Sequence, residues 1–416
     1  MMKKDLKANL SVAVCALLST VHNVQAETYD SDTELDNSIM YYSEKGRISV
    51  TAPQISLKKT LDEDNSINAS LIYDTITGAT PTGEVPYGSV QTVTSASGRT
   101  STVSASTKPS INLTDHRTAL NASWKHQLTR LFSFTAGLNH SSESDYLSNG
   151  VNLAAALDSE DKLTTLSLGL SSTQDDVSRN TKVDGVSGIP AALTDTRLLQ
   201  RQANSEPRST HDIVIGLTQV LSPKTLVQFS LSQSQSNGYL NDPYKLISVV
   251  DNNGIQVASY YESRPDNRQR KSLYTQLVHN MDDDVMRISF RLYDDDWNIQ
   301  SSTLDLKYRI NLKHFYFEPH LRLYHQSAAS FHQYYLKASD TAPDFASADA
   351  RLASFTSNTF GLSGGYDGKD YQISARLEMM AQQSSPDNQA PGNLKNYDLF
   401  NGVNATIAQV NFTLFF

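Results

Sequence analysis

The chain has 416 residues, a mean hydropathy of −0.42 and 38% hydrophobic residues. A bundle of transmembrane helices is excluded, because it needs several apolar spans of about 20 residues and the longest apolar stretch, 8–21, contains Ser11, Ser19 and Thr20. The 20 Tyr and 14 Phe exclude a wholly disordered chain, which would be poor in aromatic residues. A transmembrane β-barrel agrees with both results, since only alternate residues of its strands face lipid.

Residues 1–26 are predicted to form a secretory signal peptide. Three lysines precede a short apolar stretch, 10–21, and Val24-Gln25-Ala26 predicts cleavage after Ala26. The stretch is too short to span a membrane, so a membrane anchor is the weaker alternative. The only cysteine, Cys15, lies in this peptide, and the mature chain is therefore expected to have neither disulfides nor thiolate chemistry.

The mature chain is acidic. Cleavage removes three Lys and one Asp, which changes the formal net charge from −9 to −11. This acidity argues against binding to nucleic acid, because such binding requires a basic face. We therefore expect an exported bacterial protein with no nucleic-acid partner.

The remaining sequence alternates apolar and polar residues in segments of about ten residues, which is typical of β-strands. The clearest segments are 67–73, 120–124, 132–138, 164–170, 213–217 and 227–231. Short polar connections alternate with five long ones at 75–117, 172–210, 235–269, 326–354 and 382–402. Outer-membrane barrels have this organisation, with short periplasmic turns and long extracellular loops.

The number of strands follows from parity. About fifteen strands are recognisable from Arg47 onward, and a chain with both ends in the periplasm needs an even number. Residues 39–42 are the only candidate for a further strand before Arg47. We therefore predict an all-β fold, a single antiparallel transmembrane barrel of about 16 strands over residues 38–416. Residues 27–37 are expected to be an acidic periplasmic lead.

The last strand carries the most specific signal. Val410, Phe412, Leu414 and Phe416 form one apolar face that ends in an aromatic residue. The pattern resembles the signal that the barrel-assembly machinery reads in bacterial outer-membrane proteins. The alternative, an edge strand of a soluble sheet, would be an aggregation hazard. We therefore predict that the barrel lies in the bacterial outer membrane, in contact with lipid and lipopolysaccharide.

If alternate residues face lipid, their neighbours face the barrel interior. Many of these neighbours in 286–324 and 371–378 are charged. The residues predicted to line the lumen are Arg287, Arg291, Tyr293, Asp305, Lys307, Arg309, Glu318, His320, Arg322, Arg376 and Glu378. A charge at the lipid midplane costs ~2–4 kcal/mol, so this separation of the two faces is required.

Two interpretations of the interior charges stay open. They form a charged constriction that selects solutes in a water-filled pore, or they form an ion-pair network that fills the barrel without transport. Recordings in planar bilayers distinguish the two, because a barrel that never conducts is not a pore.

Other residues are candidates for membrane or loop contacts. The basic segment that contains Arg264, Arg268 and Arg270 contacts lipopolysaccharide phosphates, folds into the lumen, or is a solvated loop end. Trp124 and Trp297 are candidates for anchors at the membrane interface. The sequence does not decide among these roles.

Several blocks of residues occur in an order that is familiar from one protein family. They are 46–48 (GRI), Asp74 with 77–81 (TGATP), 145–146 (DY), 238–245 (GYLNDPYK), 261–265 (YESRP) and 293–297 (YDDDW). Together they resemble a family of bacterial outer-membrane proteins catalogued as a domain of unknown function. The resemblance covers nearly the whole mature chain, although Thr77 and Thr80 stand where serines are expected.

This resemblance implies a fold and a location more than a chemistry. Members of the family are often associated with small lipoproteins and with flavin-transferring, thioredoxin-like exported partners, which implies an exported lipoprotein or redox partner. The chain has no Cys-x-x-Cys-His haem site, so a redox cofactor would belong to that partner. A non-conducting barrel that acts as a scaffold for the partner is therefore one alternative to a pore.

An enzyme at the barrel rim is the other alternative. His140, His325 and His332 lie near predicted strand ends, but no Gly-x-Ser-x-Gly elbow and no His-Glu-x-x-His zinc motif is present. The aspartate triplets 282–284 and 294–296 lack the spacing of a calcium loop and are expected to be solvated turns. We therefore expect no catalysis, no metal and no cofactor. A screen for lipid hydrolysis and peptide cleavage would check this.

Overall fold

The computed structural model describes residues 31–86, 91–94, 100–104, 106, 108–178, 205–384 and 389–416. The predicted signal peptide and its cleavage site lie outside these residues. None of the helices in the described ranges is long and apolar enough to cross a membrane.

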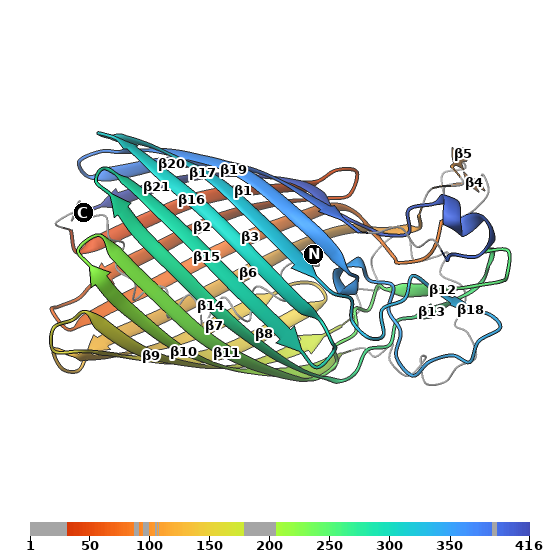
Figure 1. Ribbon diagram of the computed structural model, residues 1–416, viewed down its shortest axis with the longest axis horizontal. Coiled ribbons are helices and arrows are strands. Elements are labelled where there is room, and N and C mark those ends of the chain that lie inside the picture. The colour runs from red at the N-terminus through yellow and green to blue at the C-terminus, as the bar shows by residue number, and fades with distance from the viewer. Residues whose placement is uncertain are drawn as a thin grey trace.

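Sixteen strands form one closed antiparallel barrel, in which neighbours in space follow one another along the chain (Figure 1). The barrel strands are β1 (Thr33–Glu44), β2 (Ile48–Thr60), β3 (Asn65–Pro81), β6 (Ser110–Gln127), β7 (Phe132–Ser142), β8 (Tyr146–Asp158), β9 (Thr164–Val177), β10 (Glu206–Ser222), β11 (Thr225–Gly238), β14 (Asn267–Met281), β15 (Asp284–Asp295), β16 (Gln300–Leu312), β17 (Phe315–Gln326), β19 (Phe355–Asp367), β20 (Tyr371–Gln383) and β21 (Asn404–Phe415). The predicted all-β barrel and its strand number are confirmed.

The barrel closes where β1 pairs with β21. Glu34 lies opposite Phe415 and Glu44 opposite Ala405, and the Thr413 hydroxyl donates a hydrogen bond of 2.8 Å to Asp36. Residues 33–37 therefore belong to the barrel and not to the periplasmic lead to which the sequence analysis assigned them. Their side chains are mostly polar, and they form a strand because their backbone pairs with β2 and β21 on both sides.

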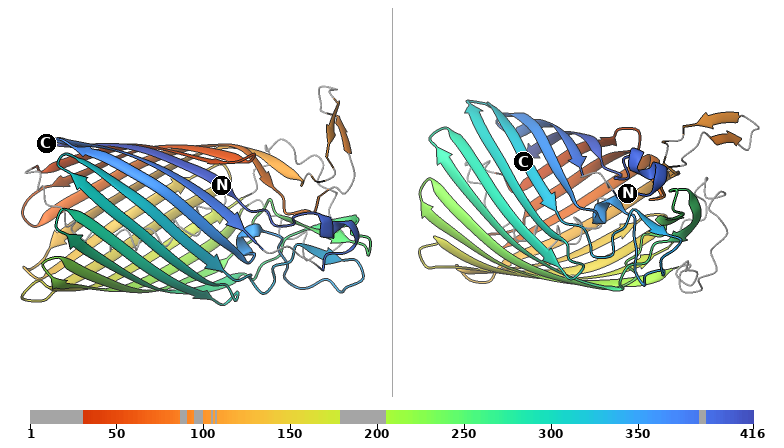
Figure 2. Two further views of the ribbon diagram at one scale, coloured as in Figure 1. Left: turned by 45° about the horizontal axis from the view of Figure 1, so that its top comes forward. Right: turned by 45° about the vertical axis from the view of Figure 1, so that its right-hand side comes forward.

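The two kinds of connection lie at opposite ends of the barrel (Figures 1 and 2). Short turns such as 61–64 and 282–283 lie at the end where the chain terminates, and the long connections lie at the other. Some strands extend further than the alternation indicated, since β3 and β6 pair from Asn65–His126 as far as Pro81–Ser110. The extension includes several Thr residues, and β-branched Thr fits a pleated sheet well.

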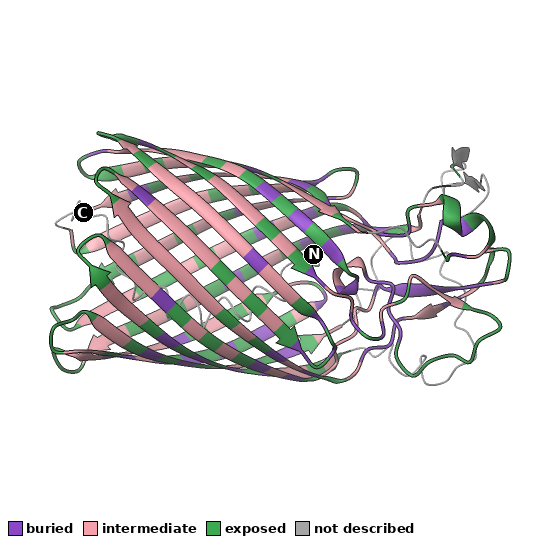
Figure 3. Ribbon diagram, viewed as in Figure 1, coloured by how far each residue is buried: buried purple, intermediate pink, exposed green. Residues whose placement is uncertain are grey.

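The outer face of the barrel is apolar and exposed. Leu138, Leu231 and Phe360 expose 64%, 59% and 64% of their surface. Exposed and less exposed residues alternate along the strands (Figure 3). Lipid covers such a face in membrane barrels, whereas an apolar surface of this size on a soluble protein would promote aggregation.

Three of the long connections fold together beyond one end of the barrel (Figure 1). We call residues 239–266, 327–354 and 389–403 the loop cap. They carry a three-stranded sheet of β12 (Leu246–Val250), β13 (Gln256–Tyr261) and β18 (Tyr335–Lys337), and the 3-10 helices η2 (Ala350–Leu352) and η3 (Gly392–Asn396). A separate hairpin, β4 (Gln91–Thr94) and β5 (Thr100–Val103), lies in the connection between β3 and β6.

Apolar contacts and one close backbone approach hold the loop cap together. Val250 and Leu394 are 0% and 1% exposed and belong to the same buried cluster. Gly392 has a φ of +51° and lies so close to the carbonyl of Asn253 that a Cβ atom would overlap it. A glycine is therefore required where the two segments meet.

Candidate functional site

A cavity of about 480 Å³ lies within the loop end of the barrel. Its wall is shared by barrel residues such as Arg291 and His320 and by loop-cap residues such as Asp242 and Arg351. Every block of the family resemblance supplies residues to this wall, among them Arg47, Thr80, Pro81, Asp145, Tyr146, Leu240, Asn241, Asp242, Pro243, Tyr244, Lys245, Arg264, Tyr293 and Trp297. These blocks are far apart in the sequence. Their common position at loop ends of strands is the signal that could have placed them together.

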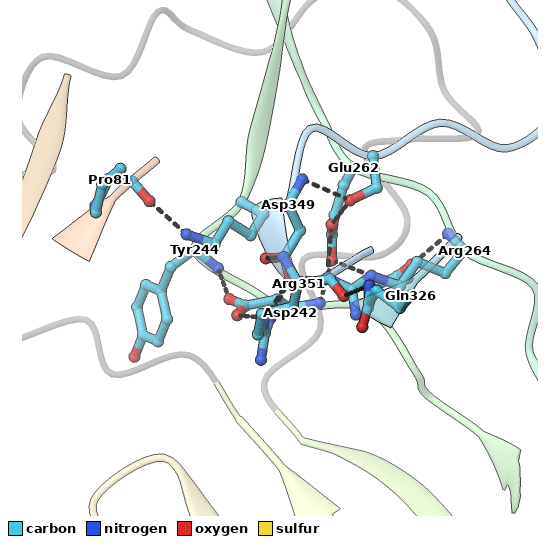
Figure 4. Close-up of polar contacts among 11 residues, drawn as sticks. Pro81, Asp242, Tyr244, Glu262, Arg264, Gln326, Asp349 and Arg351 are labelled. Atoms are coloured by element: carbon cyan, nitrogen blue, oxygen red, sulfur yellow. Dashed lines mark hydrogen bonds and ion pairs between the residues drawn. The ribbon is translucent and has the colours of Figure 1, made fainter. Parts of the chain in front are cut away.

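Five charged residues form a buried network in the loop cap, shown in Figure 4. The guanidinium of Arg264 lies 2.8 Å from both Glu262 and Asp349. Arg351 donates to Asp349 at 2.7 Å and to Asp242 at 3.0 Å. We call these five residues the cap network. It joins the segments 239–266 and 327–354, which are far apart in the sequence.

Burial and pairing determine the protonation of this region. Burial alone would raise the pKa of Asp349, but Arg351 and Arg264 outweigh it and hold that pKa well below its ordinary value. Burial raises the pKa of Glu262, although Arg264 opposes the effect. Burial also lowers the pKa of Lys245, whose ammonium donates to the carbonyl of Pro81.

A second polar cluster surrounds Asp295 of the YDDDW block. Its carboxylate accepts hydrogen bonds from Arg268 at 2.5 Å and from the Tyr293 hydroxyl at 2.7 Å. It also accepts from the backbone N–H groups of Trp297 and Ile299 at 3.1 and 2.8 Å. Asp295 therefore holds the connection between β15 and β16 in place.

The structure separates the two candidate interfacial anchors. Trp297 is only 3% exposed, its ring packs on Phe331, and the Arg268 guanidinium lies 4.2 Å from its centroid. Its prediction as an interfacial anchor is therefore wrong, because the loop cap covers the ring. Trp124 is 40% exposed near the short-turn end of β6 and packs against Phe134.

The basic segment points inward. Arg264, Arg268 and Arg270 are 7%, 7% and 5% exposed, and all three line the cavity. A solvated loop end and a contact with lipopolysaccharide phosphates both require exposed guanidiniums, so burial contradicts these two interpretations. The remaining one, folding into the barrel, agrees with the structure.

The residues predicted to line the lumen fall into two groups. Arg291, Tyr293, His320, Arg322 and Glu378 line the cavity. The others lie outside its lining and are Arg287, Asp305, Lys307, Arg309, Glu318 and Arg376. Most of the second group lie nearer the short turns, as the residue ranges of their strands show.

Most charges of this second group have partners. Arg287 lies 2.7 Å from Glu318, and Arg309 lies 3.3 Å from Asp367. Arg376 donates to Gln409 at 2.6 Å. His320 links the groups, because its two ring nitrogens lie 2.9 Å from Asp305 and 3.0 Å from Glu378. Lys307 is half-buried and lies opposite Arg287 and His320 in register.

The histidines considered for catalysis do not meet a carboxylate. His140 hydrogen-bonds Asn149 at 2.8 Å, and Nε2 of His332 is buried without a hydrogen-bond partner. His325 lies exposed at the loop end of β17. Within the described residues, none of the three forms the pairing with an acid that an activated nucleophile requires.

One carboxylate cluster was missed by the sequence analysis. Oxygen atoms of Asp115, Glu143 and Asp145 lie within 4.8 Å of one another. Nearby donors satisfy part of this charge, since the Tyr244 hydroxyl donates to Asp145 at 2.9 Å and Arg117 lies 3.9 Å from Glu143. Asp115 lies on β6, and Glu143 and Asp145 lie in the connection between β7 and β8, so the distance between the two segments in the sequence carried no signal.

A closed sixteen-stranded antiparallel barrel with an exposed apolar outer face defines a bacterial outer-membrane β-barrel protein. The fold thus points to the bacterial outer membrane. A family model described as "Protein of unknown function (DUF3570)" matches residues 7–414, and the chain belongs to that family. No curated protein matches the sequence.

Several solved structures are similar to this chain. The "CymD monoaromatic hydrocarbon channel" is 10% identical, with a TM-score of 0.40 over 93% of this chain and 89% of the other. OccK2 (OpdF) from Pseudomonas aeruginosa, solved with glucuronate, is 7% identical, with a TM-score of 0.42 over 93% and 98%. The siderophore receptor PirA from the same organism is 10% identical, with a TM-score of 0.40 over 86% of this chain and 57% of the receptor. These likenesses concern the fold alone.

Proposed function

We propose that the protein is a solute channel of the outer membrane, with a charged lumen that the loop cap narrows at its extracellular end. The supporting observation is the cavity of about 480 Å³, because barrel strands and the loop cap share its wall. Barrels of about 16 strands or more are wide enough to leave an aqueous channel. Loop residues folded into such a barrel confine the path and bring charged groups close to the solute.

The charged residues differ between the two ends of the lumen. Towards the short turns, pairs such as Arg287 with Glu318 neutralise each other against the wall. At the loop end, the cavity wall carries Arg291, Arg322 and other basic residues. Ion pairs occur at both depths, but Arg291 and Arg322 of the cavity wall are not part of them, and they mark the selective region of the lumen.

Planar-bilayer recordings of the purified protein test the proposal, and stepwise conductance is expected. Ser357 lines the cavity. The variant Ser357→Trp is expected to reduce the conductance of each step, because its indole would occupy the cavity. Thr356→Trp is the matched control, since the neighbouring side chain is exposed on the other face of β19. Protein that inserts but never conducts, or equal conductance in both variants, would contradict the proposed channel.

A further inference from the structure

Three arginines of the cavity wall carry positive charge that lacks an ion-pair partner. Arg270 on β14, Arg291 on β15 and Arg322 on β17 all line the cavity. Across the described part of the chain, Arg291 and Arg322 make neither a hydrogen bond nor an ion pair. Arg270 hydrogen-bonds only uncharged groups, the hydroxyls of Ser234 and Ser236 at 2.6 and 2.9 Å.

Arg270 is the most deeply placed of the three. It is 5% exposed, and its Nε atom is buried without a hydrogen-bond partner. A guanidinium stays protonated in proteins, so this charge cannot be removed by titration. Burial of a charge is costly, and an anion that enters the cavity would reduce this cost.

Two carboxylates that lie opposite these arginines in register are already engaged. Asp295 accepts from Arg268 and from the Tyr293 hydroxyl. Asp305 lies opposite Arg322 in register, but its oxygen lies 2.9 Å from His320, which also reaches Glu378. The positive charge of Arg291 and Arg322 is therefore left for a ligand. Arg270, in contrast, lies in register with Ser234 and, one strand further, with Asp212, whose Oδ1 is buried without a hydrogen-bond partner.

The positions of Arg291 and Arg322 suit one small ligand, whereas Arg270 lies opposite Asp295, four residues from the level of Arg291 towards the loops. Arg291 pairs in register with Thr303, and Thr303 with Tyr324, which lies two residues from Arg322 on β17. Strands β15 and β17 are separated by one strand, so their backbones lie about 10 Å apart. Tyr293 and Tyr324 also line the cavity, and their rings offer an apolar surface next to the guanidiniums.

We propose that Arg291 and Arg322 form a binding site for a small organic anion that carries a carboxylate or phosphate group, and that Arg270, nearer the loops, adds positive charge to the approach to this site. The planar guanidinium binds both groups through two parallel hydrogen bonds, which gives geometric selection as well as charge. The inference rests on the proposed channel, because the channel gives a solute access to the cavity. It names the class of solute that the channel would favour.

Isothermal titration calorimetry of the purified full-length barrel in low-salt detergent buffer tests the site without requiring conductance. The probes are gluconate, inorganic phosphate and sorbitol, the last being an uncharged analogue of gluconate. Gluconate is expected to bind and sorbitol is not. If only phosphate binds, the ligand is free phosphate and the proposed organic anion is wrong. If sorbitol binds as tightly as gluconate, the site does not select anions and the proposal is overturned.

Variants separate a specific site from general electrostatics. Arg291→Gln and Arg322→Gln are expected to weaken gluconate binding about tenfold or more, as the loss of a charge-assisted pair predicts. Lys395→Gln makes the same change of charge at an exposed position in η3 and is expected to leave binding unchanged. Arg291→Lys retains the charge and is expected to bind gluconate more tightly than Arg291→Gln does. This difference would show that Arg291→Gln has lost the binding site and not its fold. Unchanged binding in both glutamine variants would overturn the proposal.

Reversal potentials across a KCl gradient then separate the site from the channel. Anion preference that is lost in Arg291→Gln and kept in Lys395→Gln supports both proposals. Conductance without anion preference and without gluconate binding would overturn the site while the channel stands. Gluconate binding by a barrel that never conducts would support the site and contradict the channel.

Discussion

Asp295 illustrates how one buried carboxylate organises the loop end of the barrel. It accepts hydrogen bonds from Arg268, Tyr293 and two backbone N–H groups, and it is 5% exposed. We predict that Asp295→Asn destabilises the barrel by about 3–5 kcal/mol, because Arg268 keeps its charge in a buried position without its counter-charge. Thermal unfolding followed by the fluorescence of Trp297, which lies beside the pair, measures the effect.

The matched control for this prediction is Asp294→Asn. Asp294 is the exposed neighbour of Asp295 in the same block, and among the described residues its side chain accepts a hydrogen bond only from Gln300, at 3.2 Å. Its substitution is expected to change stability by no more than about 0.5 kcal/mol. Equal melting temperatures for the two variants would show that Asp295 does not hold this connection.

His332 gives the loop cap a sensitivity to acid. Burial lowers the pKa of His332 from 6.5 to about 4, although Asp349 opposes the effect, and its ring packs edge-on against Tyr334. An opened cap would bind a proton with a pKa of about 6.5. Between these two values the opened state holds more protons than the folded state, so the stability of the cap falls as the pH falls from about 6.5 to about 4.

Limited proteolysis of the loop cap between pH 7 and pH 4.5 measures this effect, with a protease active across the range. Cleavage within residues 327–354 is expected to accelerate as the pH falls. His332→Phe retains an aromatic ring that does not titrate and is expected to flatten the pH dependence. A pH profile that is the same in both proteins would exclude His332 as its source.

At the scale of the strand, the two faces of the barrel impose opposite requirements. Leu231 of β11 is 59% exposed on the outer face, whereas Ser230 lies on the inner face opposite Gly216 and Tyr274. We predict that Leu231→Lys costs ~2–4 kcal/mol, because the ammonium would face lipid. Ser230→Lys is expected to be tolerated, since it faces the interior next to a glycine. Folded yield in the outer membrane compares the two, and equal yields would contradict the assigned faces.

The same alternation explains what the sequence could predict. A strand of period two shows its inner and outer faces directly in the order of residues, so the barrel, its strand number and the positions of the long connections were all accessible. The start of β1 could not be predicted, because residues 33–37 are mostly polar and become a strand by pairing with β21. Long-range pairing of this kind leaves no local pattern.

Long-range contacts also determine most of the candidate site, so the sequence predicted less of the site than of the barrel. The inward position of Arg291 and Arg322 followed from alternation, but the burial of Trp297 and the pairing of Arg264 with Asp349 did not. Each of these contacts joins a strand end or loop to a distant segment of the loop cap. Packing between distant segments sets them, so they became visible only in the folded structure.

At the scale of the whole molecule, the cap network connects two loops that are far apart in the sequence, 239–266 and 327–354. Arg264 links Glu262 in one connection to Asp349 in another, and all three are at least nine-tenths buried. If the loop cap narrows the channel, its stability controls the conductance. Loss of Arg264 would leave two carboxylates buried without this guanidinium, which is strongly unfavourable.

We therefore predict that Arg264→Gln loosens the loop cap and raises single-channel conductance by about twofold or more, because opened loops widen the constriction. The double variant Glu262→Gln with Arg264→Gln removes one charge of each sign and is expected to lie closer to the unmodified protein. Lys395→Gln, which changes an exposed cap residue, controls for the altered charge. If proteolysis shows an opened cap in Arg264→Gln while the conductance stays the same, the cap does not set the width of the channel, and the constriction must lie among the paired charges deeper in the barrel.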